Sequence, residues 1–144
     1  MLVRCIYASR VASKLSASEL QALAAQARRK NLAVGITGIL CWTNDVFVQV
    51  LEGGRDPVCD LYTKILADKR HDHVRLMSFE DIEARSFGNW SMGHIDLKSV
   101  NPGIIMKYSE TMNLDPFRIT GRAMYAILQD LLSGGAIAIS EGRD

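Results

Sequence analysis

The sequence has few cysteines, no large excess of positive or negative charge, and no long apolar run, and each of these absences excludes a class of protein. The three cysteines lie far apart and form no Cys-x-x-Cys pair, which excludes a disulfide framework and a zinc site. We therefore expect Cys5, Cys41 and Cys59 to be small buried hydrophobic residues. The net charge is only +1, so the chain lacks the long-range field that recruits nucleic acids or an anionic membrane surface.

No stretch approaches the roughly twenty apolar residues that a membrane span needs. Arg4 interrupts the short apolar start before a secretory signal can form. We therefore expect a cytoplasmic protein without a membrane or nucleic-acid partner. What is present is an ordinary globular composition, 48% hydrophobic and 23% charged over 144 residues, which fits one folded domain.

The first two thirds of the chain alternate between strand and helix patterns. The expected elements are a strand at 2–8, a helix from the Ser16–Glu19 capping box to near Asn31, a hairpin of 34–42 and 46–51, a helix at 57–67 with Asp56 as N-cap and Pro57 as its first residue, and strands at 74–79 and 90–97. This βαββαββ order predicts an α+β fold, a ferredoxin-like sheet with two helices on one face.

The rest of the chain supplies a cover for the second face of the sheet. Apolar residues at helical spacing predict a long helix at 119–132, ended by Gly134 and Gly135, and a shorter helix at 105–112. We expect the last residues, 137–144, to fray. The predicted division is a domain at 1–98 and a helical extension at 99–144 that packs on the sheet and mediates assembly.

Three polar residues stand where apolar side chains are expected. Gln49 shares a strand face with Phe47 and Leu51, and a buried amide needs hydrogen-bond partners. The hydroxyl group of Tyr7, on a predicted apolar face, needs one as well. Asn31 at the end of the first helix adds a third short polar group. Taken singly, each is more typical of a satisfied core residue or of a helix cap.

Together these residues stand within five stretches that resemble the BLUF family of blue-light sensors. The stretches are RCIYAS with Tyr7, NLAVGITGIL with Asn31, FVQVLEGG with Gln49, DKRHDHV, and NWSMGHI with Trp90 and Met92. Their order and spacing agree with the family from residue 2 to about residue 97, which is more specific than any single motif.

The resemblance implies a flavin bound non-covalently between the two helices above the sheet. FAD is the usual occupant of the family, with FMN or riboflavin as alternatives. Tyr7 is then the electron donor, Gln49 links Tyr7 to the flavin, and Asn31 holds the edge of the ring. Trp90 and Met92 are the pair of which one lies near Gln49, and the sequence leaves open which. The implied apolar walls are Ile36, Leu40, Phe47 and Ile65.

Basic residues lie close to two of these stretches. Arg28, Arg29 and Lys30 stand where the cofactor phosphates emerge in the family, although a basic helix end is also an ordinary solvated terminus. Arg70 and His71 match the stretch that contacts the pyrimidine side of the ring. His71 and His73 have an H-x-H spacing, but no acidic or thiol partner is spaced to complete a metal site, so we expect no metal.

The predicted function is a blue-light photoreceptor that is not an enzyme. Fewer than fifty residues follow Leu97, too few for a cyclase or phosphodiesterase domain, so the signal is expected to pass to a partner chain through the fifth strand and the last helix. The alternatives are a flavin-dependent oxidoreductase and a ferredoxin-like binding module without cofactor. We also expect a homodimer, with a contact surface formed by Ile104, Ile105, Tyr125 and Ile137.

Overall fold

The described part of the chain forms one mixed sheet. The computed structural model describes residues 1–11, 15–43 and 45–134. The strands are β1 (Leu2–Val11), β2 (Thr37–Thr43), β3 (Val46–Gly54), β4 (His71–Ile82) and β5 (Gly93–Asp96). Their order across the sheet is β4-β1-β3-β2-β5. The first four strands pair antiparallel, whereas β5 lies parallel to β2.

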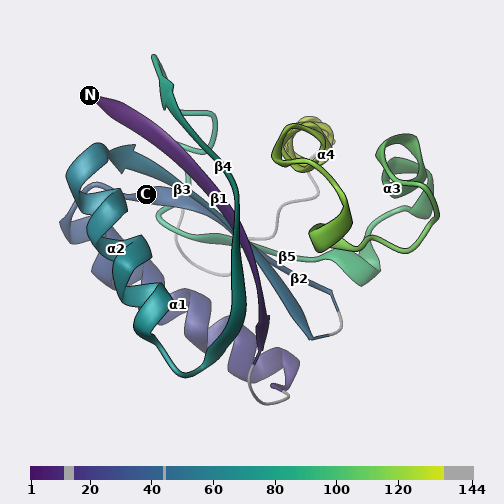
Figure 1. Cartoon of the computed structure of the whole chain (residues 1–144), viewed down its shortest axis with the longest axis horizontal. Helices are drawn as coiled ribbons and strands as arrows, with labels where there is room; N and C mark the ends of the chain where they lie inside the picture. Colours follow the sequence, from purple (N-terminus) through teal and green to yellow (C-terminus); the bar gives the residue numbers. More distant parts are fainter. Residues whose placement is uncertain (12–14, 44, 135–144) are drawn as a thin grey trace.

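Helices cover both faces of this sheet (Figure 1). They are α1 (Ala17–Ala33), α2 (Arg55–Ala67), α3 (Pro102–Tyr108) and α4 (Gly121–Ser133), with two 3-10 turns, η1 (Leu97–Ser99) and η2 (Pro116–Arg118). Helices α1 and α2 lie on one side, and α4 lies on the other side with α3 beyond it. The predicted ferredoxin-like α+β fold is therefore confirmed. None of the described helices combines the length and apolar character that a membrane span requires.

The sheet separates two hydrophobic cores. Cys5 and Tyr7 of β1 point toward α1 and α2, whereas the alternate residues Ile6 and Ala8 point toward α4. All four side chains are at most 1% exposed. A strand buried on both faces explains why the first segment of the sequence lacks a clear polar side.

Helix α1 begins as predicted and ends later. The Ser16 hydroxyl accepts from the Glu19 amide at 3.2 Å, and the Glu19 carboxylate accepts from the Ser16 amide at 3.1 Å. The helix continues through Asn31 to Ala33, so Asn31 lies in its last turn and is not the cap. Strand β2 consequently begins at Thr37 and not at residue 34.

The predicted start of α2 was wrong by two residues. Gly54 still pairs with Leu2 of β1 and is itself the N-cap, without a side-chain hydrogen bond. The helix follows directly at Arg55, so Asp56 and Pro57 lie within its first turn. Asp is common at N-caps and Pro at the first helical position, so the Asp56–Pro57 pair predicted a start two residues too late; an acidic residue in the first turn is also favourable because of the helix dipole.

The C-terminal helices also differ from their predicted bounds. Asn101 caps α3 by accepting from the Gly103 amide at 2.8 Å, and Pro102 is its first residue. The short helix therefore covers 102–108 and not 105–112. Helix α4 follows the prediction closely, with Thr120 as N-cap and Gly134 as C-cap. The expectation for residues 137–144 falls outside the described residues.

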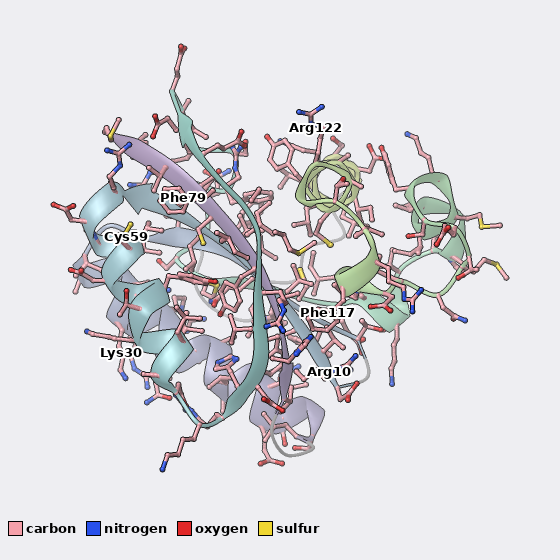
Figure 2. All side chains as sticks on the ribbon, in the orientation of Figure 1. Arg10, Lys30, Cys59, Phe79, Phe117 and Arg122 are labelled. Atoms are coloured by element: carbon pink, nitrogen blue, oxygen red, sulfur yellow. The ribbon has the colours of Figure 1, made fainter. Side chains whose placement is uncertain are left out.

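Two predictions about exposure were wrong. Cys59 is exposed, whereas Cys5 and Cys41 are buried, because the buried face of α2 passes through Val58 and the next residue is turned about 100° away. Figure 2 labels Cys59 on α2.

The predicted contact surface was also wrong, because most of it is used inside the chain. Ile105 is only 3% exposed. Ile104 and Tyr125 are half-buried and pack against the core under α4. Ile137 lies outside the described residues.

Candidate functional site

Tyr7 and Gln49 form the centre of the site. They are directly opposed in the pairing of β1 with β3, and the Tyr7 hydroxyl donates a hydrogen bond to Oε1 of Gln49. Both side chains are buried, at 1% and 7% exposure. Burial, more than the neighbouring Cys5, Tyr62 and Asp68, raises the pKa of the Tyr7 phenol. The phenol therefore stays protonated at neutral pH and can donate this hydrogen bond.

The other end of the Gln49 amide contacts Met92. Nε2 of Gln49 donates to Sδ of Met92 at 3.4 Å. Met92 is fully buried in the core beneath α1 and α2, whereas Trp90 packs in the core beneath α4. The chain bends at 91–92 before β5 begins at Gly93, so the two side chains do not share the face that a regular strand gives them. Met92 is the one of the pair that lies near Gln49.

A cavity of about 490 Å³ opens beside this pair, between α1 and α2 above the sheet. The size suits a small-molecule ligand. Its lining residues from α1 and the following turn are Leu23, Gln26, Ala27, Lys30, Asn31, Val34 and Ile36. The sheet contributes Tyr7, Leu40, Gln49 and His71, and α2 with the following turn contributes Pro57, Asp60, Leu61, Lys64, Ile65, Asp68 and Arg70.

Asn31 presents an unsatisfied donor to this cavity. The residue is 3% exposed, and its Nδ2 has no hydrogen-bond partner within the described residues. Its main-chain oxygen accepts from the amides of Val34 and Ile36 at 3.1 and 3.0 Å, which fixes the backbone at the end of α1. An unpaired buried amide group costs about 1–3 kcal/mol, so this donor points to a ligand acceptor.

His71 is held against the cavity wall by a residue of β1. Its Nδ1 lies 2.9 Å from the hydroxyl of the buried Ser9. Its ring also meets the Tyr7 ring at 6.4 Å and the Phe47 ring at 5.7 Å between centroids. Burial lowers the pKa of His71, and Asp68 and Arg70 act in opposite directions on it. The neutral imidazole is therefore favoured at this wall.

His73, the second histidine of the H-x-H spacing, points elsewhere. It has a positive φ of 51°, and its ring lies 5.2 Å from that of Phe117. The Arg10 guanidinium covers the same Phe117 ring at 4.9 Å, and Figure 2 shows Arg10 and Phe117 side by side. The two histidines therefore lie in different environments.

A charged pair forms part of the cavity rim. Arg70 Nη2 lies 2.6 Å from Oδ2 of Asp68, and the Arg70 amide donates to Oδ1 of the same carboxylate at 2.9 Å. Hydrogen bonds from Arg70 lower the pKa of Asp68 to about 2. Asp68 is therefore ionised at neutral pH, and it orients Arg70.

The structure brings most of the predicted binding residues together and leaves some outside the lining. The predicted residues that line the cavity are Tyr7, Lys30, Asn31, Ile36, Leu40, Gln49, Ile65, Arg70 and His71. Phe47 lies behind the wall, against His71, and Arg29 is exposed outside the lining. Arg28 acts on another residue, since its charge contributes to lowering the pKa of His94 after the larger effect of burial.

The sequence interpretation missed several lining residues of the two helices. On α1, Leu23 and Ala27 stand eight and four residues before Asn31 and share its face. On α2, Pro57 and Leu61 hold the same relation to Ile65. Helical spacing counted from Asn31 and Ile65 could have identified them.

Comparison with known proteins places these residues in a family. The family model described as "Sensors of blue-light using FAD" matches residues 2–93. The photoactivated adenylate cyclase subunit beta of Euglena longa is 35% identical over 92 residues, 63% of this chain and 11% of that protein. The chain therefore spans about a tenth of the length of that relative.

Solved structures of similar size agree over most of the chain. BlsA in its photo-activated state has a TM-score of 0.79 and 28% identity, with 100% of this chain and 99% of that chain covered. BlrB, a BLUF protein in its dark state, has a TM-score of 0.76 and 29% identity, with 93% and 96% covered. The chain belongs to the BLUF family, the sensors of blue light that use FAD.

Proposed function

We propose that this chain is a photoreceptor that binds FAD non-covalently in the cavity between α1 and α2. The observation that carries the proposal is the chain of hydrogen bonds from Tyr7 through Gln49 to Met92, in which Tyr7 and Gln49 line the cavity. The match to a family of blue-light sensors that use FAD supports the same function.

The residues present fit a flavin. A flat heteroaromatic ring needs apolar walls and a few polar groups at its edge. Ile36, Leu40 and Ile65 supply the walls, and Phe47 backs His71 from behind. The unpaired Nδ2 of Asn31 supplies a buried donor for a ring carbonyl.

Charged groups at the rim suit the remainder of FAD. Arg70 and His71 are proposed to contact the pyrimidine side of the ring. Lys30 lines the cavity, and Figure 2 shows it on the side of the molecule that carries α1 and α2. We assign Lys30 and its neighbour Arg29 to the phosphates, with FMN and riboflavin as the alternatives that lack part of this contact.

Bound flavin supplies absorption of blue light and an excited state that accepts an electron. Tyr7 is proposed as the donor of both the electron and the phenolic proton; the bound flavin would accept both, and the proton would pass through the hydrogen bond from Tyr7 to Gln49. The Gln49 amide carries a donor at one end and an acceptor at the other, so a rearrangement exchanges its partners. The side chains of Tyr7 and Gln49 are both buried, so bulk water competes little for the same groups.

The signal is proposed to leave through a second chain. We assign the sensor to residues 1–98 and the helical extension, with assembly as its role, to residues 99–144. The chain is proposed to act as a cytoplasmic, non-enzymatic homodimer that contacts an unidentified protein partner. Met106 of α3 and Met112 after it are 52% and 63% exposed, and we propose that they belong to the contact between the two copies.

One absorption experiment on the purified full chain separates the candidate functions. A yellow protein whose flavin band shifts reversibly to the red under blue light supports the photoreceptor. A yellow protein that turns over an electron acceptor supports a flavin-dependent oxidoreductase. A colourless protein that does not take up added FAD supports a binding module without cofactor, and either of the last two results overturns the proposal.

A further inference from the structure

A buried ion pair lies on the side of the sheet away from the cavity. Arg4 of β1 and Glu52 of β3 are directly opposed in the strand pairing. Their side chains are 7% and 0% exposed, and Arg4 Nε lies 2.8 Å from Oε2 of Glu52. Two buried charges are unfavourable unless further hydrogen bonds use their capacity. The partners of this pair therefore indicate what it holds in place.

Glu52 holds the loop between β4 and β5. Its Oε2 accepts from the amide of Ser86 at 3.0 Å, and its Oε1 accepts from the amide of Phe87 at 2.7 Å. Arg85 adds a bond from Nη1 to the main-chain oxygen of Glu52 at 3.3 Å. The middle of the loop is thus fixed on β3.

Met92, which contacts Gln49, lies at the end of the same loop. Five residues after Phe87 the chain reaches Met92, whose Sδ accepts from Gln49. Between these points the main-chain oxygen of Trp90 accepts from the amide of Gly38 at 3.0 Å. A Cβ at Gly38 would lie 1.8 Å from the main-chain oxygen of Val50, so only glycine allows this close approach of β2 and β3 beside the loop.

The ion pair also reaches α4. Arg4 Nη2 donates to the Ser86 hydroxyl at 2.9 Å, and a 2.7 Å hydrogen bond joins that hydroxyl to the Tyr125 hydroxyl. The Arg4 guanidinium lies 4.3 Å from the centre of the Tyr125 ring. Gln129, one turn later on α4, donates to the Tyr125 hydroxyl as well.

We infer that Arg4, Glu52 and Tyr125 are positioning residues that link the Gln49–Met92 contact on one face of the sheet to α4 on the other. This inference rests on the proposed function, since it names the route by which that site affects the helical extension. Hydrogen bonds join the loop to Glu52, to Arg4 and to Tyr125, and those that involve a charged group are the stronger ones. We therefore expect a displacement of Met92 to affect the loop, the Ser86 hydroxyl and Tyr125 together.

A double-mutant cycle on the FAD-loaded full chain in the dark tests the link. Met92→Leu removes the sulfur that Gln49 contacts, and Tyr125→Phe removes only the hydroxyl that Ser86 contacts. Met92 and Tyr125 belong to the two cores on opposite faces of the sheet. We expect their effects on the unfolding equilibrium constant to differ from additivity by at least about twofold.

Tyr108→Phe is the matched control for Tyr125→Phe. The Tyr108 hydroxyl donates to Oδ2 of Asp130 on α4 at 2.6 Å, outside the Arg4–Glu52 network. The cycle of Met92→Leu with Tyr108→Phe is expected to be additive. Additivity in the Tyr125 cycle, or equal coupling in both cycles, overturns the inference.

Illumination of the same variants tests whether the photoreceptor uses the link. Hydrogen exchange of the α4 amides is expected to change on illumination of the wild-type protein. Tyr125→Phe should reduce this change by at least half, and Tyr108→Phe should preserve it; an unchanged response in Tyr125→Phe overturns the link as a signal route. If the dark cycle shows coupling but the protein shows no red shift, the photoreceptor is rejected and the link is retained. If the protein shows a red shift but the Tyr125 cycle is additive, the photoreceptor is retained and the link is rejected.

Discussion

Nε2 of Gln49 lies 3.4 Å from Sδ of Met92. A thioether is a weak acceptor, so this end of the amide is held less firmly than the end that accepts from the Tyr7 hydroxyl. An amide with one firm and one weak partner can change its orientation without breaking two strong hydrogen bonds. We therefore expect Gln49 to be the movable member of the group.

Replacing Gln49 with Leu tests this role. The substitution keeps the volume of the side chain and removes both ends of the amide. FAD should still bind, and the light-induced red shift of the absorption band should disappear. Gln26→Leu is the control, since Gln26 also lines the cavity but is exposed on α1, and it should retain the shift. A normal red shift in Gln49→Leu contradicts the assignment.

Replacing Tyr7 with Phe tests the electron donor. The ring remains, but the phenolic proton that Gln49 accepts is lost. We expect the light-driven cycle to be abolished and flavin fluorescence to rise, because the quenching donor is weakened. Tyr62→Phe is the control, since the Tyr62 ring lies 5.6 Å from that of Tyr7 and its hydroxyl is not bonded to Gln49. Unchanged photochemistry in Tyr7→Phe would assign the donor elsewhere.

Much of this fold could be predicted from local signals. The Ser16–Glu19 capping box, the helical spacing after Thr120 and the mainly apolar run along β1 each determine their element through neighbouring residues. The start of α2 could not be read in this way, because the pairing of Gly54 with Leu2 sets it and that pairing joins distant parts of the chain. The position of Met92 depends on a bend, which the parity of a regular strand does not describe.

The candidate site was predictable where a polar residue contradicted an apolar pattern, as at Gln49. The Arg4–Glu52 pair left no such trace, because a charged residue near a strand end is ordinary in a sequence. Only the tertiary structure shows that both side chains are buried and share the loop at Ser86.

Replacing Asn31 with Leu should have opposite effects on stability and on binding. In the FAD-free protein the substitution removes a buried Nδ2 without a partner, so the free energy of unfolding should stay equal or rise. FAD affinity should fall by roughly tenfold, because a ligand hydrogen bond is lost. Equilibrium unfolding in urea and titration with FAD measure the two effects. Asn113→Leu, at an exposed position, should change neither quantity, and unaltered FAD affinity in Asn31→Leu contradicts its role.

The stability of the FAD-free protein should depend on pH through His71. Burial lowers the pKa of His71 in the folded protein, so below about pH 6.5 the unfolded chain binds a proton that the folded chain excludes. The free energy of unfolding should therefore fall as the pH decreases from about 7.5 to about 5.5. His71→Gln should reduce this fall. It should not abolish it, because burial lowers the pKa of His94 as well. Equal pH dependence in wild type and His71→Gln contradicts the expectation.

Self-association should depend on the exposed methionines near α3. Ile105 and Tyr125 are used inside the chain, which leaves Met106 and Met112 as the large apolar residues exposed on the helical extension within the described residues. An isologous dimer is the commonest closed assembly and would bury both methionines of each copy. Light scattering at roughly micromolar concentration should give twice the mass of 16.0 kDa.

The double substitution of Met106 and Met112 by Glu should return the monomer, because it places charges in the contact. Leu66→Glu, at a 53% exposed position of α2, is the control and should remain dimeric. A monomeric mass for the wild-type protein in both dark and light contradicts the dimer, and a larger ring contradicts its two-fold symmetry.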